Sequence, residues 1–361
     1  MKFAAIGHQE NWQKVSRFIK AVRDLKSLKE LTIDQIKEVY GFIPPRTMFD
    51  VNVESSASGL CNGVYIETFI SPDELDANHL RVNLKKVLDA CHYAASINIP
   101  IVSLGGFTSI VLESSGYNVK KICGTCFTTG NTLTAGFIVK AVEKACLHWK
   151  QPLEKSSVMI IGSTGDIGSA CTKYFAGKAK ELILCARQKG PLEEQAISLL
   201  VNKVDVNWST DINKFLGKAD IVVCVASSIL EKCNVSLLSP HAIICDAGYP
   251  KNLYNTLNHL THRIFFGGMG IVEHGYNFQP GYADEIYRFP IPNIVHGCLL
   301  EAIVLAMDGT PMPLSTGRGN ITMDSMERII KVAASHGIHP APLFNSSLIG
   351  DNHQNLHYER N

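Results

Sequence analysis

Residues 156–169 read SSVMIIGSTGDIGS, and the interpretation of the rest of the chain starts from this stretch. Its apolar run, Val158 to Ile161, has the length of a buried central strand and ends abruptly at the first of three glycines, Gly162, Gly165 and Gly168. In a strand–turn–helix unit, such glycines allow the tight turn, the approach of a pyrophosphate and the packing of helix on sheet. Ser169 to Phe175 can continue as a helix whose free amide groups point at the phosphates. The stretch therefore predicts a dinucleotide site.

The second strand of this unit indicates which dinucleotide binds. Residues 182–187 read LILCAR, so the strand ends in Arg187, where an NAD-binding unit normally carries an acidic residue for the ribose. A cation there, with Lys189 behind it, suits a 2'-phosphate and predicts NADPH. An ordinary strand–turn–helix and a solvated charge remain the alternatives. The predicted cofactor-binding residues are Gly162, Ser163, Thr164, Gly165, Asp166, Ile167, Gly168, Arg187, Ala226 and Ser227.

Composition excludes several classes of protein. With 361 residues, of which 46% are hydrophobic and 19% charged, the chain is long enough for two domains. A net charge of +1 gives no reason to expect nucleic-acid binding. The apolar runs are too short to span a bilayer and the first residues lack a signal-peptide core, so we expect a cytoplasmic protein. The eleven cysteines are scattered, and the single CxxC pair, Cys123 and Cys126, has no second pair beside it, so we expect no metal.

The order of predicted elements indicates the fold class. Strands near 204–207, 219–226, 242–246 and 263–266 alternate with helices after the glycine turn, which predicts an α/β fold with a doubly wound, Rossmann-like parallel sheet. We expect an N-terminal α/β substrate domain at 1–151, the NADPH-binding domain at 152–289, a C-terminal helical segment at 290–344 and a flexible tail at 345–361.

Two further segments of the N-terminal domain suggest function. Residues 11–40 have a helical period and carry regularly spaced lysines and arginines, which form either a solvated face or a docking surface for an acidic partner such as an acyl carrier protein. Residues 105–109 (GGFTS) and 127–132 (FTTGNT) both place glycine and hydroxyl residues before a helix. Two such loops in one domain indicate a lined site, although each one is also typical of a capped helix.

A cysteine opens the apolar helix predicted at 294–307. Cys298 follows Gly297, so it falls in the first turn, where the helix dipole lowers the pKa of a thiol and favours the nucleophilic thiolate. Glu301, three residues on, faces roughly the same side and raises that pKa if it is ionised. On composition alone, Cys298 is one packing cysteine among eleven.

Seven motifs together give the chain a family resemblance. The chain resembles the long-chain acyl-[acyl carrier protein] reductases known from cyanobacteria, and the matching segments run in the same order over residues 2 to 342. They are residues 6–8 (IGH), 104–110 (LGGFTSI), 127–132 (FTTGNT), 162–169 (GSTGDIGS), 248–253 (GYPKNL), 272–274 (VEH) and 319–322 (GNIT).

The resemblance implies a reaction and a nucleophile. It implies that NADPH reduces a long-chain acyl thioester to a fatty aldehyde, and the family's Cys-x-x-Glu-Ala motif matches Cys298 to Ala302. Cys298 would carry the acyl group, and Tyr249, Lys251 or His274 would supply a proton. Backbone amides near Gly105 and Gly106 or near Gly130 would hold the oxyanion. The implied partners are an acyl carrier protein or acyl-CoA as donor and an enzyme that consumes the aldehyde.

Two other functions are compatible with the same residues. One is an oxidoreductase of the shikimate dehydrogenase or glutamyl-tRNA reductase kind, which acts on a small polar substrate. The other is a regulatory protein that binds NADP(H) without turnover. Activity with soluble substrates would indicate the first, and binding of NADPH without its consumption would indicate the second.

Overall fold

The structure of the chain is a computed structural model with two compact units. Unit 1 consists of Met1–Phe137, Thr164–Tyr174 and Gly268–Pro340, and unit 2 consists of Ile138–Ser163, Phe175–Gly267 and Ala341–Asn361. The predicted boundaries at 151 and 289 divide the chain in sequence order, whereas each compact unit combines separate segments. The structure describes residues 1–76, 78–117, 119, 121–226, 233–248, 253–254, 257, 263–281, 291–315, 320–346 and 348–349.

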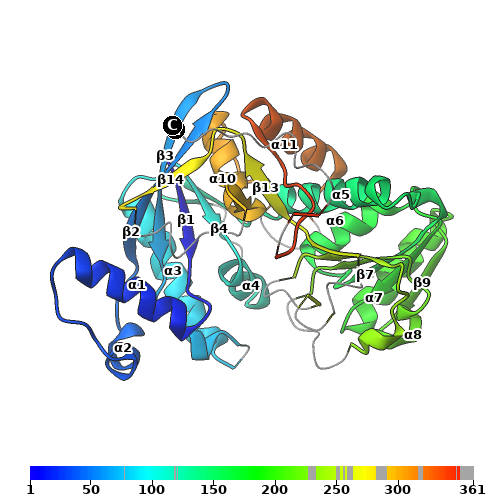
Figure 1. The fold of residues 1–361 in the computed structure, drawn as a ribbon, viewed down its shortest axis with the longest axis horizontal. Coiled ribbons are helices and arrows are strands. Elements are labelled where there is room, and N and C mark those ends of the chain that lie inside the picture. Colours follow the sequence, from blue (N-terminus) through cyan, green and yellow to red (C-terminus); the bar gives the residue numbers. More distant parts are fainter. Residues whose placement is uncertain are drawn as a thin grey trace. The chain divides into compact units, whose positions relative to one another are not determined.

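Unit 2 contains the predicted parallel sheet (Figure 1). Its six strands, as far as the described residues go, are all parallel, in the order β12-β11-β10-β7-β8-β9. The strand order reverses at β7, the strand before the glycine turn, which is the topological switch point of a doubly wound sheet. The predicted fold class is therefore confirmed. The strands are β7 (Ser157–Ile161), β8 (Glu181–Cys185), β9 (Val206–Ser209), β10 (Ile221–Cys224), β11 (Ile243–Asp246) and β12 (Arg263–Phe266).

The helices of this region begin earlier than the sequence indicated. Helix α6 (Asp166–Phe175) belongs to unit 1 except for its last residue, and it starts three residues before the expected Ser169. Helix α7 (Lys189–Val201) contains the expected helix near 193–201 as its second half, and α8 (Asn213–Leu216) follows β9. The core under the sheet is apolar, with Met159, Val222 and Ile264 almost fully buried. Burial on both faces explains why these strands are continuous apolar runs.

Unit 1 contains a mixed sheet. Its seven strands, counted over the described residues, lie in the order β14-β2-β3-β1-β4-β6-β5, and β3, β1, β4 and β6 are parallel. A smaller sheet has the order β15-β13-β16. The strands are β1 (Phe3–Gly7), β2 (Arg46–Ser55), β3 (Gly59–Glu67), β4 (Ile101–Leu104), β5 (Lys121–Ile122), β6 (Thr125–Thr128), β13 (Met269–Val272), β14 (Tyr276–Gln279), β15 (Ile294–His296) and β16 (Ile338–Pro340).

Helices cover both faces of the larger sheet of unit 1. Helices α3 (Leu80–Ser96) and α4 (Phe107–Ser114) share a core with Ala4, Ile6 and Val102, whereas α10 (Gly297–Met307) shares a core with Phe3 and Ile101 on the opposite face. Successive strand residues point to opposite faces, so this alternation fixes which side chains can meet α10. Helix α11 (Met323–Ser335) also belongs to unit 1, whereas α5 (Asn131–His148) begins in unit 1 and continues in unit 2.

The helix expected over residues 11–40 is two helices, α1 (Trp12–Leu25) and α2 (Ile33–Tyr40). The break follows from local chemistry, because Ser27 adopts a left-handed backbone conformation with φ of 52°. Thr32 then starts α2 by accepting a hydrogen bond from the Gln35 amide, and the Gln35 side chain bonds back to the Thr32 amide. Among the helices of the described residues, none is long and apolar enough to cross a membrane.

Candidate active site around Cys298

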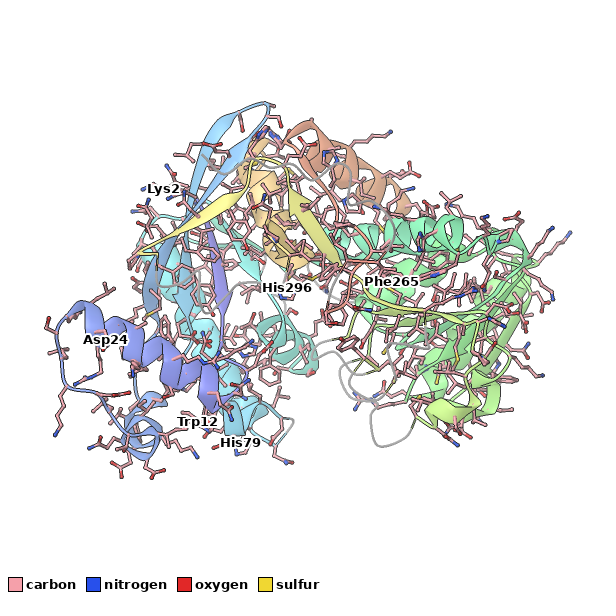
Figure 2. All side chains as sticks on the ribbon, viewed as in Figure 1. Lys2, Trp12, Asp24, His79, Phe265 and His296 are labelled. Carbon is pink, nitrogen blue, oxygen red and sulfur yellow. The ribbon has the colours of Figure 1, made fainter. Side chains whose placement is uncertain are left out.

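Cys298 lies where α10 begins, at the carboxyl edge of the larger sheet of unit 1. It is partly exposed, and it follows His296, the N-cap residue of α10 that Figure 2 labels, and Gly297. Ser103, on β4, donates a hydrogen bond of 2.6 Å from its hydroxyl to the Cys298 carbonyl. A Cβ on Gly105 would lie 3.1 Å from the sulfur. The sulfur therefore lies against the backbone just after β4. This backbone belongs to the first of the two predicted glycine loops, residues 105–109.

The second predicted glycine loop packs against the backbone of the same cysteine. Gly130 has φ of 73°, and a Cβ there would lie 2.3 Å from the Cys298 Cα atom. A side chain cannot occupy that space, so the loop after β6 can approach α10 only because residue 130 is glycine. The structure thus brings both loops, which are 25 residues apart at Gly105 and Gly130, to one cysteine.

Burial and hydrogen bonds act in opposite directions on the Cys298 thiol. Burial raises its pKa and is the largest effect, whereas hydrogen bonds from the amides of Gly106, Leu299 and Cys298 itself lower the pKa. The charge of Glu301 raises the pKa further. The expected lowering by the helix start is present, but burial outweighs it. The resting thiol therefore keeps its proton at neutral pH, and the amides are placed to stabilise the sulfur as its charge develops.

Glu301 is fully buried and joins α10 to the loop after β6. Its carboxylate accepts hydrogen bonds from the Thr128 hydroxyl, from the Leu133 amide at 2.8 Å and from the Ser315 hydroxyl at 3.4 Å. Burial raises the pKa of Glu301 to about 7, although these hydrogen bonds oppose the shift. The sequence suggested only that Glu301 affects Cys298. Its partners lie on separate segments, which no local sequence pattern connects.

Asn131 connects this loop to the helix of the glycine turn. Its amide nitrogen donates to the Ser315 hydroxyl at 3.1 Å, and its side chain donates to the Asp166 carboxylate at 2.9 Å. Asp166 is the first residue of α6 and is almost completely buried. The loop that covers the Cys298 backbone therefore also contacts the start of the helix that the predicted dinucleotide site uses.

The glycine turn has features that fit a pyrophosphate. Gly162 has φ of 92°, and its amide donates to the Cys185 carbonyl at 2.8 Å. A Cβ on Gly162 would lie 3.0 Å from the Ala226 amide nitrogen, so a side chain would fill the approach to the turn. The hydroxyl of Ser163 is buried without a hydrogen-bond partner in the described part of the chain, and an anion would supply one. Predicted Ser227 lies outside the described residues.

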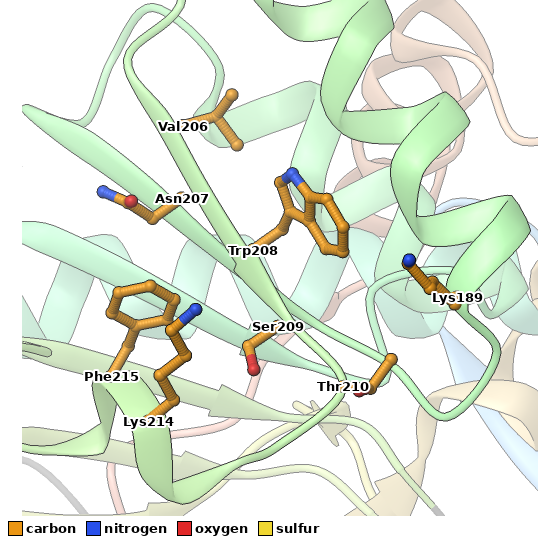
Figure 3. Close-up of a pocket in the computed structure, with 8 residues that line it drawn as sticks. All are labelled: Lys189, Val206, Asn207, Trp208, Ser209, Thr210, Lys214 and Phe215. Atoms are coloured by element: carbon orange, nitrogen blue, oxygen red, sulfur yellow. The ribbon is translucent and has the colours of Figure 1, made fainter.

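Cations follow the second strand of unit 2 as expected. Arg187 is exposed just after β8 and makes no hydrogen bond or ion pair with any described residue. Lys189 begins α7 and lies at the edge of a pocket of about 400 Å³ along β9, in which it faces Trp208 (Figure 3). The pocket contains none of the residues that surround Cys298. Its lining residues are Lys189, Val206, Asn207, Trp208, Ser209, Thr210, Lys214 and Phe215.

Of the three predicted proton donors, only His274 lies in the described part of the chain. Tyr249 and Lys251 lie outside the described residues. His274 is exposed in the turn after β13, and its ring lies 3.0 Å from the Ser56 hydroxyl. Ser56 is in the hairpin before β3, whereas Cys298 lies at the edge where the parallel strands end. Two polar residues that sequence reasoning missed, Tyr65 and Glu67, do lie at the end of β3.

Comparison with known proteins defines the class and then the family. No family model matches the chain. A curated relative, a long-chain acyl-[acyl-carrier-protein] reductase of Synechococcus elongatus, is 31% identical over 324 residues, which cover 86% of this chain and 92% of the relative. The aminotransferase PigE of a Serratia species is 24% identical over 295 residues, which are 81% of this chain and 34% of that protein.

Solved structures with partial similarity include two dehydrogenases. The L-tryptophan dehydrogenase of Nostoc punctiforme has a TM-score of 0.38 and 14% identity, with 93% of this chain and 80% of that chain covered. The quinate dehydrogenase of Corynebacterium glutamicum, in complex with NAD, has a TM-score of 0.35 and 12% identity, with 73% and 86% covered. The relative of 31% identity makes the chain an oxidoreductase, and the parallel sheet of unit 2 is Rossmann-like. The chain belongs to the family of long-chain acyl-[acyl-carrier-protein] reductases.

Proposed function

We propose that this chain uses NADPH to reduce a long-chain acyl thioester to a fatty aldehyde, with the acyl group held on Cys298 between the two steps. The observation that carries the proposal is the position of Cys298. The residue is half-buried in the first turn of α10, its sulfur lies next to Gly105, and the sulfur accepts a hydrogen bond from the Gly106 amide. A buried packing cysteine has neither this exposure nor this set of donors.

The acyl-transfer step follows from the chemistry of the thiol. The Cys298 sulfur bonds to the carbonyl carbon of the donor thioester, the donor carbon–sulfur bond breaks, and the donor sulfur leaves with the proton that Cys298 loses. One thioester replaces another, so the exchange has little net cost. Because burial raises the pKa of the thiol, this proton must leave as the substrate arrives.

The cofactor proposal uses residues at two strand ends of unit 2. Gly162 and the hydroxyl of Ser163 would hold the pyrophosphate, and Arg187, with Lys189, would hold the 2'-phosphate of NADPH. When bound, NADPH supplies the hydride that reduces the acyl carbon. The carbon–sulfur bond to Cys298 then breaks, the aldehyde leaves and the sulfur regains a proton.

The donor and the partners are proposed with the function. The name of the Synechococcus relative suggests an acyl carrier protein as donor. Acyl-CoA is the second candidate donor, and an aldehyde-consuming enzyme and a cytoplasmic location belong to the same proposal. Charge on α1 is compatible with an acidic carrier. Lys14 and Lys20 are paired with Glu10 and Glu30, whereas Arg17 is exposed on the same helix.

Intact-mass measurement tests this function directly. Incubation with palmitoyl-CoA in the absence of NADPH should add one acyl group to the wild-type chain and none to Cys298→Ala, whereas both proteins should bind NADPH equally. Addition of NADPH should then release the acyl group as aldehyde. An equal adduct on Cys298→Ala would exclude Cys298, and binding of NADPH without consumption would favour the regulatory alternative.

A further inference from the structure

Two glycines lie side by side on the sheet face that α10 covers. In the register of β1 and β4, Ile6 is opposite Leu104. We infer from this register that Gly7, the last residue of β1, lies beside Gly105, the residue that follows β4. Adjacent strands are about 4.8 Å apart. Ala5 and Ser103 are opposite each other two residues earlier, and Ser103 bonds to Cys298, so this is the face of α10. The glycines leave the end of this face without side chains.

Each glycine lies beneath one reactive group. A Cβ on Gly105 would lie 3.1 Å from the Cys298 sulfur, and a Cβ on Gly7 would lie 2.6 Å from the Tyr65 hydroxyl. The thiol and the phenol are thus positioned over neighbouring strands, with only glycine between them and the sheet. Gly7, Tyr65, Gly105 and Cys298 are all partly exposed.

The Tyr65 ring is held in place by neighbours that the mechanism has not used. It stacks on Phe49, with ring centres 4.8 Å apart and planes 5° apart. Its hydroxyl donates to the Glu67 carboxylate at 3.2 Å. Glu67 is fully buried and also accepts from the Gln9 side chain at 2.6 Å and from the Phe69 amide at 3.2 Å. A buried carboxylate with three donors fixes the phenol at the edge of the sheet.

We propose that the Tyr65 hydroxyl is the hydrogen-bond donor to the carbonyl oxygen of the acyl group that forms on Cys298, over the floor made by Gly7 and Gly105. The inference rests on the proposed thioester function. A carbonyl group bonded to the sulfur over Gly105 can point its oxygen across the neighbouring strand towards the phenol. The carbonyl oxygen and the phenol oxygen would then be about 2.7 Å apart, the usual length of an O–H···O bond. The donor stabilises the charge that develops on this oxygen in acyl transfer and again in reduction. A phenol has a single O–H, so the acyl oxygen replaces the Glu67 carboxylate as its acceptor. Glu67 is a positioning residue that holds the phenol in place until the acyl group forms.

The test compares two reactions of the same sulfur in Tyr65→Phe. Acylation by palmitoyl-CoA, followed by intact mass without NADPH, needs stabilisation of a carbonyl oxygen, whereas alkylation by iodoacetamide places no such charge on an oxygen at this position. We expect Tyr65→Phe to slow acylation about 100-fold, as for loss of one oxyanion donor, and to leave alkylation unchanged. The ratio of the two rates is independent of any loss of folded protein.

A second tyrosine gives the matched control. The Tyr93 hydroxyl in α3 also makes hydrogen bonds, both with Thr47 at 3.3 Å, and lies on the face away from α10. Tyr93→Phe should acylate at the wild-type rate. An unchanged ratio of acylation to alkylation in Tyr65→Phe would overturn the role of Tyr65 while leaving the thioester function intact. Failure of the wild-type chain to acylate would overturn the proposed function and this inference together.

Discussion

At the scale of single residues, the site depends on a carboxylate in an unfavourable place. Glu301 is fully buried in α10, three residues after Cys298, and its hydrogen bonds to Thr128, Leu133 and Ser315 do not fully compensate the loss of water. Its pKa is therefore raised to about 7. The Glu301 carboxyl joins α10 to the loop after β6 and to Ser315. Because burial disfavours its charged form, ionisation of Glu301 lowers the stability of the fold, and this effect depends on pH.

The first prediction concerns the pH dependence of stability. Because the pKa of Glu301 is about 7 in the folded chain and 4.5 for an ordinary glutamate, the folded state keeps a proton that the unfolded state loses between these values. The free energy of unfolding should therefore fall as pH rises through this window, by at most about 3 kcal/mol. Glu301→Gln cannot ionise, so its stability should fall less between pH 5 and pH 8 in urea unfolding.

The control for this experiment is another glutamate in the same unit. Glu327 is exposed on α11, so Glu327→Gln should follow the wild-type pH dependence. Burial also raises the pKa of Glu67 to about 7. Glu67 is present in all three proteins, so its effect on the pH dependence of stability cancels when they are compared. A wild-type pH dependence in Glu301→Gln would show that Glu301 does not titrate in this window.

At the scale of elements, the loop after β6 and the start of α10 are in contact at backbone distance. Only glycine at residue 130 allows this contact, because a Cβ there would overlap the Cys298 backbone. Ser103 on β4 and Thr128 on β6 then fix α10 from below, through the Cys298 carbonyl and the Glu301 carboxylate. The position of Cys298 is thus set by two strand ends rather than by α10 alone.

The second prediction separates backbone strain from this close contact. Gly130 and Gly59 both have φ of 73°, but nothing lies within 4 Å of a Cβ on Gly59. Gly59→Ala should therefore cost about 1 kcal/mol, from the left-handed conformation alone. Gly130→Ala should cost about 1–3 kcal/mol more, because the loop or α10 must move, and it should slow acylation of Cys298. Chemical unfolding and acylation rates measure both effects, and equal costs would argue against the close packing.

At the scale of the whole molecule, the chain combines a Rossmann-like sheet in unit 2 with a separate sheet in unit 1 that carries the proposed nucleophile. The parallel sheet of unit 2 places Gly162 and Arg187 at the ends of adjacent strands β7 and β8. The larger sheet of unit 1 places Gly7 at the end of β1, Gly105 directly after β4 and Gly130 shortly after β6. Both arrangements follow the general tendency of parallel sheets to bind ligands at the carboxyl ends of their strands.

The third prediction concerns cofactor choice, read from the stability of the whole chain. A ligand that binds only the folded state stabilises it by about 2.7 kcal/mol at 100 times its Kd. NADPH should therefore raise the thermal midpoint more than NADH at equal concentration, and Arg187→Gln should abolish this difference. Lys180→Gln, which removes an exposed cation just before β8 rather than after it, should retain the difference. Equal shifts from NADPH and NADH in the wild-type chain would exclude a 2'-phosphate site at Arg187.

The sequence by itself determined the elements whose cause is local. The apolar run before Gly162, the spacing of the three glycines and the start of α10 at Gly297 all follow from residues close together in the chain, so the doubly wound sheet and the first-turn position of Cys298 could be predicted. Local causes also explain the misses in detail. The predicted helix over residues 11–40 is divided by the left-handed residue Ser27 and by the N-cap Thr32. The helical period, averaged over the whole segment, does not show this break.

Only the tertiary structure decided which residues meet at the sulfur. Strand register pairs Ile6 with Leu104 and thereby aligns Gly7 with Gly105. Packing buries the Cys298 thiol, and this burial raises its pKa more than the amides at the helix start lower it. His274 carries the right chemistry but lies by the hairpin before β3, whereas Tyr65 and Glu67 lie where β3 ends. Such proximity depends on contacts between residues that are far apart in the sequence. Residue types and their spacing along the chain cannot predict these contacts unless the fold is known.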